Sequence, residues 1–378
     1  MYKDIVEFIK ESYPNKDKIA LYEPSFRGNE IAYLSQAIND GYVSVHGRFL
    51  KKVEDQLKKI TSADYVVLTN SGTSALHLSL LALGITKNDE VLVPSFTYVA
   101  TSNAISYVGA TSHFVDIERE TLGICPKKLK FFLENHTEIR DEQCYNKKTN
   151  RNIRACIPVH AFGNPCKIKE LREVCGLYNI SIIEDAAEAL GSTISKEHVG
   201  TFGHLGILSF NGNKIITSGG GGAVLTNDKK LFNQIRHLAA QAKTNSLGYD
   251  HDALGYNYKM NNLNAALLLA QLEQLNDKLR KKKLLHERYK FFFDSYDQID
   301  LCTTNQPNIT PNYWLNALFF KDAYSRDIFV SISNKSGVET RKAWTPLHMF
   351  DWIDAYNDGD FNITASVSEQ CALLPSYI

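Results

Sequence analysis

The sequence has no excess of charge of either sign and no long apolar run. Its 42 Lys and Arg residues balance its 42 Asp and Glu residues, which leaves no electrostatic footprint for nucleic acid or for an anionic membrane surface. No stretch approaches the ~20 consecutive apolar residues of a membrane-spanning helix, and the residues after Met1 do not have the pattern of a signal peptide. We therefore expect a cytoplasmic protein that binds neither nucleic acid nor membrane.

Disulfide and metal-binding patterns are missing as well. The seven cysteines, spread from Cys125 to Cys371, include no Cys-x-x-Cys pair. An odd number of scattered cysteines favours reduced thiols over a disulfide framework. No His-x-x-x-His pair or carboxylate cluster indicates a metal site, so we expect no metal.

Two common nucleotide-binding motifs are absent. The glycines at 219–222 follow Lys214 instead of preceding it, and Lys214 is followed by Ile215, so the pattern G-x-x-x-x-G-K-[ST] is not formed. No G-x-G-x-x-G opens the first predicted βα unit. The sequence therefore disfavours ATP and NAD as ligands.

Short apolar runs alternate with helix-like stretches between residues 63 and 227. Most of these runs are continuous rather than alternating, as in strands that are covered on both faces. Helical patterns such as Thr73–Leu83 and Ile168–Tyr178 lie between them, and this rhythm predicts an α/β fold with a mainly parallel sheet. The expected strands are Tyr65–Leu68, Glu90–Val93, Ser112–Asp116, Arg154–Val159, Ser181–Glu184, Gly206–Phe210 and Ala223–Thr226.

The pattern changes after about residue 240. Residues 262–294 predict one long helix, in which the basic segment Lys278–Lys283 is expected to be a solvated face rather than a binding patch. Leu315–Phe320 is an expected strand of a smaller α+β domain, and Asp141–Arg154 is an expected polar surface excursion. Because 378 residues exceed what one core usually supports, we expect a large domain at 1–245, whose N-terminal helix could pack on a small domain at 246–378.

Three local features fall where predicted strands end, the edge at which open α/β sheets bind ligands. Gly72 and Thr73 open a helix whose N-terminus could hold an anion, with an ordinary helix cap as the alternative. Asp185 ends a buried strand, where its carboxylate needs a partner; a protonated pyridine ring is one, and a capping role is the alternative. Lys214 lies among apolar and small residues beside four glycines, which favours a functional lysine over a surface charge.

These features and others, in the same order along the chain, resemble the DegT/StrS family of sugar-nucleotide aminotransferases, which are fold-type I pyridoxal-phosphate enzymes. The resemblance covers nearly the whole chain. No single motif is specific, but eight in the right order are. They are Gly41-Tyr42-Val43-Ser44 with Gly47, Asn70-Ser71-Gly72-Thr73-Ser74-Ala75-Leu76, Pro94-Ser95-Phe96-Thr97-Tyr98, Pro158-Val159-His160-Ala161-Phe162-Gly163, Glu184-Asp185-Ala186-Ala187, Ser209-Phe210 with Lys214, Gly255-Tyr256-Asn257-Tyr258-Lys259-Met260, and Trp344-Thr345-Pro346-Leu347-His348.

The resemblance implies how this chain would hold pyridoxal 5'-phosphate. Lys214 would be the catalytic lysine that carries the cofactor as a Schiff base, and Asp185 would pair with the pyridine nitrogen. Tyr98 would stack on the ring. The phosphate ligands would be Gly72, Thr73 and Ser209.

Two further positions carry expectations of their own. Glu188, at a position that is often Gln in the family, would lie near the ring hydroxyl, and we expect it to be shifted towards its protonated form or turned aside. Asn257 resembles the residue that reaches the phosphate of the neighbouring subunit, which implies an obligatory homodimer with shared active sites. A turn Asn before a helix is the alternative for Asn257.

The resemblance also implies the reaction, which moves an amino group from glutamate to a nucleotide-linked keto sugar. Related dehydratases carry His at the lysine position, so Lys214 favours transamination. The segment around Lys214 resembles the branch that aminates C4 of UDP-linked 4-keto-6-deoxy-N-acetylhexosamines for bacterial surface glycans, and Trp344 and His348 are candidates for the sugar side, with a fold-stabilising role as the alternative. A 3-keto sugar aminotransferase, a pyridoxal-dependent sugar dehydratase and a non-catalytic pyridoxal-binding regulator are the competing functions.

Overall fold

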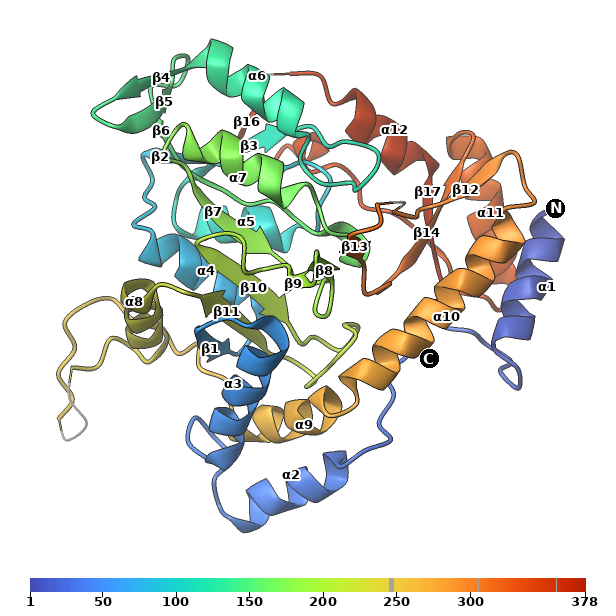
Figure 1. Ribbon diagram of the computed structural model, residues 1–378, viewed down its shortest axis with the longest axis horizontal. Coiled ribbons are helices and arrows are strands. Elements are labelled where there is room, and N and C mark those ends of the chain that lie inside the picture. Colours follow the sequence, from blue (N-terminus) through green and yellow to red (C-terminus); the bar gives the residue numbers. More distant parts are fainter. Residues whose placement is uncertain (245–247, 305, 358) are drawn as a thin grey trace.

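A large mixed sheet forms the centre of the protein in the computed structural model, which describes residues 1–378 except 245–247, 305 and 358 (Figure 1). Along its main path β11 alone runs antiparallel to its neighbours, so the expected α/β fold with a mainly parallel sheet is confirmed. The strands of this path, in spatial order, are β1 (Tyr65–Thr69), β11 (Gly222–Thr226), β10 (Leu205–Ser209), β7 (Ser181–Asp185), β6 (Asn152–Cys156), β2 (Asp89–Pro94), β3 (Thr111–Val115) and β16 (Ala355–Asn357).

Helices cover both faces of this sheet, which explains why its strands are apolar at nearly every position. Successive strand residues point to opposite faces: Ile182 and Leu208 belong to one hydrophobic cluster, whereas Ile183 and Ile207 belong to the other. The first cluster is covered by α3 (Arg48–Thr61), α6 (Pro126–His136), α7 (Ile168–Gly176) and α9 (Asn262–Leu272), and the second by α4 (Gly72–Ala82), α5 (Ala100–Tyr107) and α8 (Lys229–Ala239).

A second, four-stranded antiparallel sheet carries most of the C-terminal region. The N-terminal helix α1 (Tyr2–Ser12) packs against it and against α11 (Ala323–Lys335), and the three share a hydrophobic cluster of their own. One C-terminal segment does not stay with this sheet, because β16 pairs with β3 at the edge of the large sheet. The strands of the small sheet, in spatial order, are β12 (Ile299–Leu301), β14 (Asn316–Phe320), β17 (Cys371–Leu374) and β15 (Arg341–Lys342).

The remaining elements are short or lie at the rim of the two sheets. None of the helices in the described ranges is long and apolar enough to cross a membrane. These elements are α2 (Glu30–Asn39), α10 (Leu275–Phe293), α12 (Asn362–Gln370), the 3-10 turns η1 (Ala161–Gly163) and η2 (Leu347–Met349), the hairpin β4 (Thr137–Arg140) with β5 (Gln143–Asn146), and a small sheet of β13 (Ile309–Thr310), β8 (Thr193–Ile194) and β9 (Glu197–His198).

Four sequence-based expectations need correction. The expected strand Arg154–Val159 ends early, because Pro158 has no N–H to continue the ladder. Much of the expected polar excursion is the β4–β5 hairpin, whose turn residues Asp141 and Glu142 both have positive φ (47° and 62°), as a two-residue hairpin turn requires.

The third correction concerns the long helix, which is divided into α9 and α10 at Glu273 and Gln274. Both side chains bind the N-terminal region instead: Glu273 accepts from Tyr33 (2.6 Å), and Gln274 donates to Glu30 (2.8 Å). After this break α10 runs away from α2 and α3 towards the small sheet and α1 (Figure 1). The basic segment of α10 is not a solvated face throughout, because two of its lysines, at 278 and 282, are buried.

Candidate active site

The turn between β1 and α4 presents free backbone amides. Ser71 caps the helix: its Oγ accepts from the Ser74 amide (3.0 Å), and its carbonyl accepts from the Ala75 amide (3.1 Å). The amides of Gly72 and Thr73 precede these and have no helical carbonyl to bind. Ser209, at the end of β10, lies against the same turn, since a Cβ on Gly72 would be 3.1 Å from the Ser209 Cβ. The structure therefore places Ser209 beside Gly72, with Thr73 next to it in the same turn.

Asp185 ends β7 inside the protein, where its side chain is buried. Its carboxylate accepts from the Thr101 hydroxyl (2.8 Å) and from the Ala187 amide (3.2 Å). Burial raises the pKa of Asp185 above its usual value, and these two donors offset part of that shift. A buried carboxylate with only neutral donors is suited to receive a cationic group.

Lys214 follows β10, and its amine points towards a second buried acid. Its Nζ lies 3.3 Å from Oε1 of Glu188, whose Oε2 accepts from the Phe162 amide (2.9 Å). Burial raises the pKa of Glu188, whereas the nearby Lys214 lowers it. The direction agrees with the expected shift towards the protonated form, and the side chain of Glu188 faces Lys214 rather than turning aside.

Tyr98 and Asn257 lie at the open side of this arrangement. Tyr98 is 59% exposed, and Asn257 is exposed on a segment that runs beside the β1–α4 turn. That segment is fixed there by two hydrogen bonds: the Asn70 side chain donates to the Asn257 carbonyl (3.2 Å), and the Asn70 amide donates to the Tyr258 carbonyl (2.8 Å). Within the described part of a single chain, no hydrogen bond joins either side chain to Lys214, Asp185 or Glu188.

Trp344 and His348 make contacts that stabilise the loop after β15. The Trp344 ring packs on Phe162 and Phe96, with centroid distances of 4.6 and 5.2 Å. His348 is 2.6 Å from the Ser95 hydroxyl through Nδ1 and stacks on Phe361 at 4.2 Å. Phe96 and Ser95 directly precede the loop that carries Tyr98, so both residues lie beside that loop and also hold the fold together.

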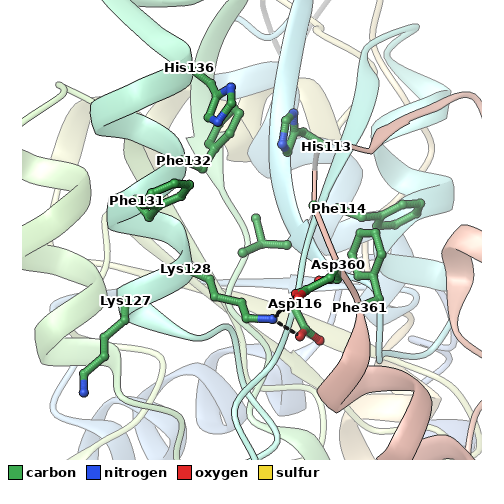
Figure 2. Close-up of a pocket in the computed structure, with 12 residues that line it drawn as sticks. His113, Phe114, Asp116, Lys127, Lys128, Phe131, Phe132, His136, Asp360 and Phe361 are labelled. Carbon is green, nitrogen blue, oxygen red and sulfur yellow. Dashed lines mark hydrogen bonds and ion pairs between the residues drawn. The ribbon is translucent and has the colours of Figure 1, made fainter.

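A cavity of about 420 Å³ lies elsewhere, between α6 and the β3 edge of the large sheet (Figure 2). Its Lys128 is paired with Asp116 (2.6 Å) and with Asp360. None of the site residues expected from the sequence lines it. One residue of its lining, Phe361, stacks on His348.

Sequence reasoning missed two residues in contact with this site. Thr101 binds Asp185, and the ring of Trp314 lies 4.1 Å from the Lys214 Nζ. Both come from other parts of the chain and belong to no local pattern around Lys214 or Asp185. The sequence offers one hint for Thr101, which follows Thr97 by about one helical turn. It offers none for Trp314.

The donor set fits one cofactor. Free helix amides and a hydroxyl suit a phosphate, a buried carboxylate suits a protonated pyridine nitrogen, and an amine beside them suits an aldehyde. On this fold, such a set defines a pyridoxal-phosphate-dependent aminotransferase.

Comparisons with known proteins agree with that class. Residues 24–378 match the model of the DegT/DnrJ/EryC1/StrS aminotransferase family. The chain is 36% identical over 330 residues to a GDP-perosamine synthase of Escherichia coli O157:H7, covering 87% of this chain and 85% of the relative. It is 33% identical to a GDP-perosamine synthase of Vibrio cholerae, covering 95% and 94%. The chain therefore belongs to the DegT/DnrJ/EryC1/StrS aminotransferase family, and its cofactor is pyridoxal phosphate.

Solved structures support the same fold. A DegT DnrJ EryC1 StrS aminotransferase from Brucella abortus superimposes with a TM-score of 0.84 at 25% identity, over 92% of this chain and 90% of that one. The Streptococcus pneumoniae protein Spr1654 in its PLP form gives a TM-score of 0.85 at 23% identity, over 96% and 94%. The fold is thus that of fold-type I aminotransferases, as the sequence indicated.

Proposed function

We propose that this protein transfers an amino group from glutamate to C4 of a nucleotide-linked 4-keto-6-deoxy sugar, in the synthesis of a bacterial surface glycan. The observation that carries the proposal is the position of the Lys214 Nζ, 3.3 Å from Glu188 and close enough to Asp185 to affect the charge of its carboxylate. The fold and the family supply the class of reaction. The lysine distinguishes transamination from dehydration.

The residues of the site divide the work of the reaction. When bound, pyridoxal phosphate supplies a ring that withdraws electrons from the substrate carbon. The Gly72 and Thr73 amides and the Ser209 hydroxyl would hold its phosphate, and the Asp185 carboxylate would keep the ring nitrogen protonated. Lys214 would anchor the cofactor, and its free Nζ would accept the proton of the amino-bearing carbon of glutamate and later donate one to the sugar carbon that receives the amino group. Glu188, next to Nζ, holds the released lysine at the site.

We also propose that the active unit is a homodimer. Tyr98 and Asn257 are exposed in the single chain. Tyr98 is proposed to stack on the cofactor ring, which would cover it, and Asn257 is proposed to bind the phosphate in a second subunit. Mixing inactive Lys214→Ala and Asn257→Ala variants tests this arrangement. If subunits exchange and sites are shared, mixed dimers contain one site with both natural residues and regain activity; mixtures that stay inactive after subunit exchange contradict it.

The nucleotide attached to the acceptor sugar is the most specific part of the proposal. The segment around Lys214 favoured a UDP-linked N-acetylhexosamine, whereas two relatives at 33–36% identity are named GDP-perosamine synthases. Identity over most of both chains outweighs one local segment, so we propose a GDP-linked acceptor. Trp344 and His348, beside the Tyr98 loop, are the side chains proposed for the sugar.

An absorbance titration tests the central assignment. The purified protein should show the band of the covalently held cofactor, and glutamate should bleach it. Lys214→Ala should abolish the band, whereas Lys283→Ala, which removes an exposed lysine of α10, should preserve it. A wild-type protein without the band, or a Lys214→Ala variant that keeps it, contradicts the assignment. Product NMR with GDP-, UDP- and dTDP-linked 4-keto sugars then identifies the acceptor and the aminated carbon.

A further inference from the structure

Trp314 contacts the cofactor lysine in two ways. Its ring lies 4.1 Å from the Lys214 Nζ, and its indole Nε1 donates to the carbonyl of Asn213, the preceding residue, at 2.7 Å. The Trp314 side chain is buried. One rigid side chain thus limits both the path of the backbone before Lys214 and the direction of its amine. A cation over an indole face is attracted to it.

The loop that carries Trp314 is also joined to Glu188, the acid that faces the same lysine. Asn312 is fully buried; its Oδ1 accepts from the Trp314 amide (2.9 Å), and its Nδ2 donates to the carbonyl of Glu188 (2.9 Å). Between them Tyr313 has a φ of 53°, a left-handed conformation that is costly for a residue with a side chain. The Tyr313 ring stacks on His286 at 4.4 Å. Asn312 therefore ties Trp314 and Glu188, the two neighbours of the Lys214 amine, to each other.

Lys282 holds this loop from behind. The lysine is buried in α10, and its Nζ donates to the carbonyls of Trp314 (2.8 Å) and Ser376 and lies 5.0 Å from the ring centroid of Tyr22. The Tyr22 hydroxyl donates in turn to the Lys214 carbonyl. No carboxylate within the described residues forms an ion pair with Lys282. Burying a cation costs hydration free energy. Lys282 uses its N–H groups to hold the segment whose Trp314 contacts Lys214.

We propose that Trp314, held by Asn312 and Lys282, is a positioning residue that fixes the Lys214 amine for bond formation with the cofactor. This inference rests on the proposed function of Lys214 as the cofactor anchor. In the step concerned, Nζ first gives its extra proton to solvent, and its lone pair would then add to the aldehyde carbon of pyridoxal phosphate. A C=N bond would form as the C=O bond breaks, and the oxygen would leave as one water with the two remaining amine protons. Trp314 makes no bond in this step. It restricts Nζ to directions from which attack is productive, and such orientation accelerates bond formation without changing the reagents.

The experiment separates reversible cofactor binding from covalent attachment. Apoprotein is mixed with increasing pyridoxal phosphate in a stopped-flow instrument, and growth of the absorbance band gives a limiting rate and a half-saturating concentration. Trp314→Leu should lower the limiting rate about tenfold and leave the half-saturating concentration unchanged. Trp314→Phe, which keeps a ring face but loses the Nε1 hydrogen bond, should lower it only about threefold. Trp352→Leu removes an exposed tryptophan and should match the wild type.

Each outcome bears on the proposal. A Trp314→Leu variant that attaches the cofactor at the wild-type rate overturns it. So does a variant in which the limiting rate, cofactor affinity and melting temperature fall together with no recovery in Trp314→Phe, because that pattern belongs to a purely structural residue. If the wild type forms no band, or Lys214→Ala forms one, the proposed function itself fails, which is a different result.

Lys282 supplies an independent check. Since it acts through Trp314, Lys282→Met should slow attachment, and the double variant should be no slower than the slower single variant. Additive slowing contradicts that coupling. If Lys282→Met does not fold, Asn312→Ala replaces it in the same cycle, because it removes the oxygen that accepts from the Trp314 amide.

Discussion

Two regions near Lys214 bury ionisable groups of opposite type. At the edge of the large sheet, Asp185 and Glu188 are buried acids, and burial raises the pKa of each. In α10, Lys278 and Lys282 are buried bases, and burial lowers their pKa values from 10.5 to about 8 and about 7. The same physical cause, loss of hydration of the charged form, acts in both regions.

The two regions nevertheless use this cost differently. Glu188 faces Lys214, and Asp185 faces the position proposed for a cationic ring, so bound cofactor can supply the charged partner that Asp185 lacks among its hydrogen-bond donors. The bases of α10 donate to carbonyl groups: Lys282 to Trp314 and Ser376, and Lys278 to Ser25 (3.2 Å). Buried ionisable groups therefore serve ligand binding at the sheet edge. In α10 they hold backbone segments from other parts of the chain in position.

Opposite shifts also give opposite responses to pH. An acid with a raised pKa keeps its proton in the folded state over a range where the unfolded state has lost it, so stability falls as pH rises through that range. A lysine with a lowered pKa has lost its proton in the folded state where the unfolded state keeps it, so stability rises with pH between the lowered value and 10.5. These responses make the comparison testable.

The largest effect is expected from Asp185→Asn. Asparagine has one oxygen where Asp185 uses two, so its Oδ1 can accept from the Ala187 amide while its Nδ2 donates to the Thr101 hydroxyl. The protonated ring nitrogen is then left without a counter-charge, so cofactor affinity should fall roughly a hundredfold. The melting temperature of the apoprotein should not fall, because a buried charge is removed. Equilibrium dialysis of pyridoxal phosphate and thermal melting measure both. Asp300→Asn, at an exposed position in β12, is the control, and an unchanged affinity in Asp185→Asn argues against its role.

The two regions differ in how far they can be predicted from sequence. Asp185 ends one buried strand and Lys214 lies shortly after another, so short apolar runs locate them. Seven of the eight strands along the main path of the large sheet were expected within a few residues of their positions, and β16 was not expected. Their chemical roles remain predictions. Lys282 lies in a basic run whose helical period gives no indication of burial, because its acceptors are 32 and 94 residues away in the chain.

The same limit explains the break between α9 and α10. Periodicity continues across Glu273 and Gln274, and their partners Tyr33 and Glu30 are more than 200 residues away. Trp314 has no local signal for a comparable reason, since its importance lies in contact with Asn213 and Lys214 about a hundred residues earlier. Contacts between distant segments decide these features, and a single sequence does not contain them.

An intermediate effect is expected from Lys282→Met. In the wild-type apoprotein, Lys282 should add about 1.4 kcal/mol of stability per pH unit as pH rises from about 7 towards 9. The variant should lose that part of the slope, while Lys278 continues to contribute above about pH 8. Thermal melting from pH 6 to 9 measures the difference, and Lys283→Met, at an exposed neighbour, should follow the wild type. Parallel curves for the wild type and Lys282→Met would show that Lys282 is not buried as a titrating base.

The smallest effect is expected from Glu188→Gln, which tests the acidic side. Glutamine keeps the shape and can still accept from the Phe162 amide, but it carries no charge that burial can disfavour. The apoprotein variant should therefore melt about 2 °C above the wild type at neutral pH, and the difference should shrink as pH falls and Glu188 takes up its proton. Loss of attraction to the Lys214 amine opposes this gain, but burial is the larger influence on Glu188. A variant that melts below the wild type at neutral pH would show that the 3.3 Å contact with Lys214 outweighs burial, and that the sheet edge is already neutralised without the cofactor.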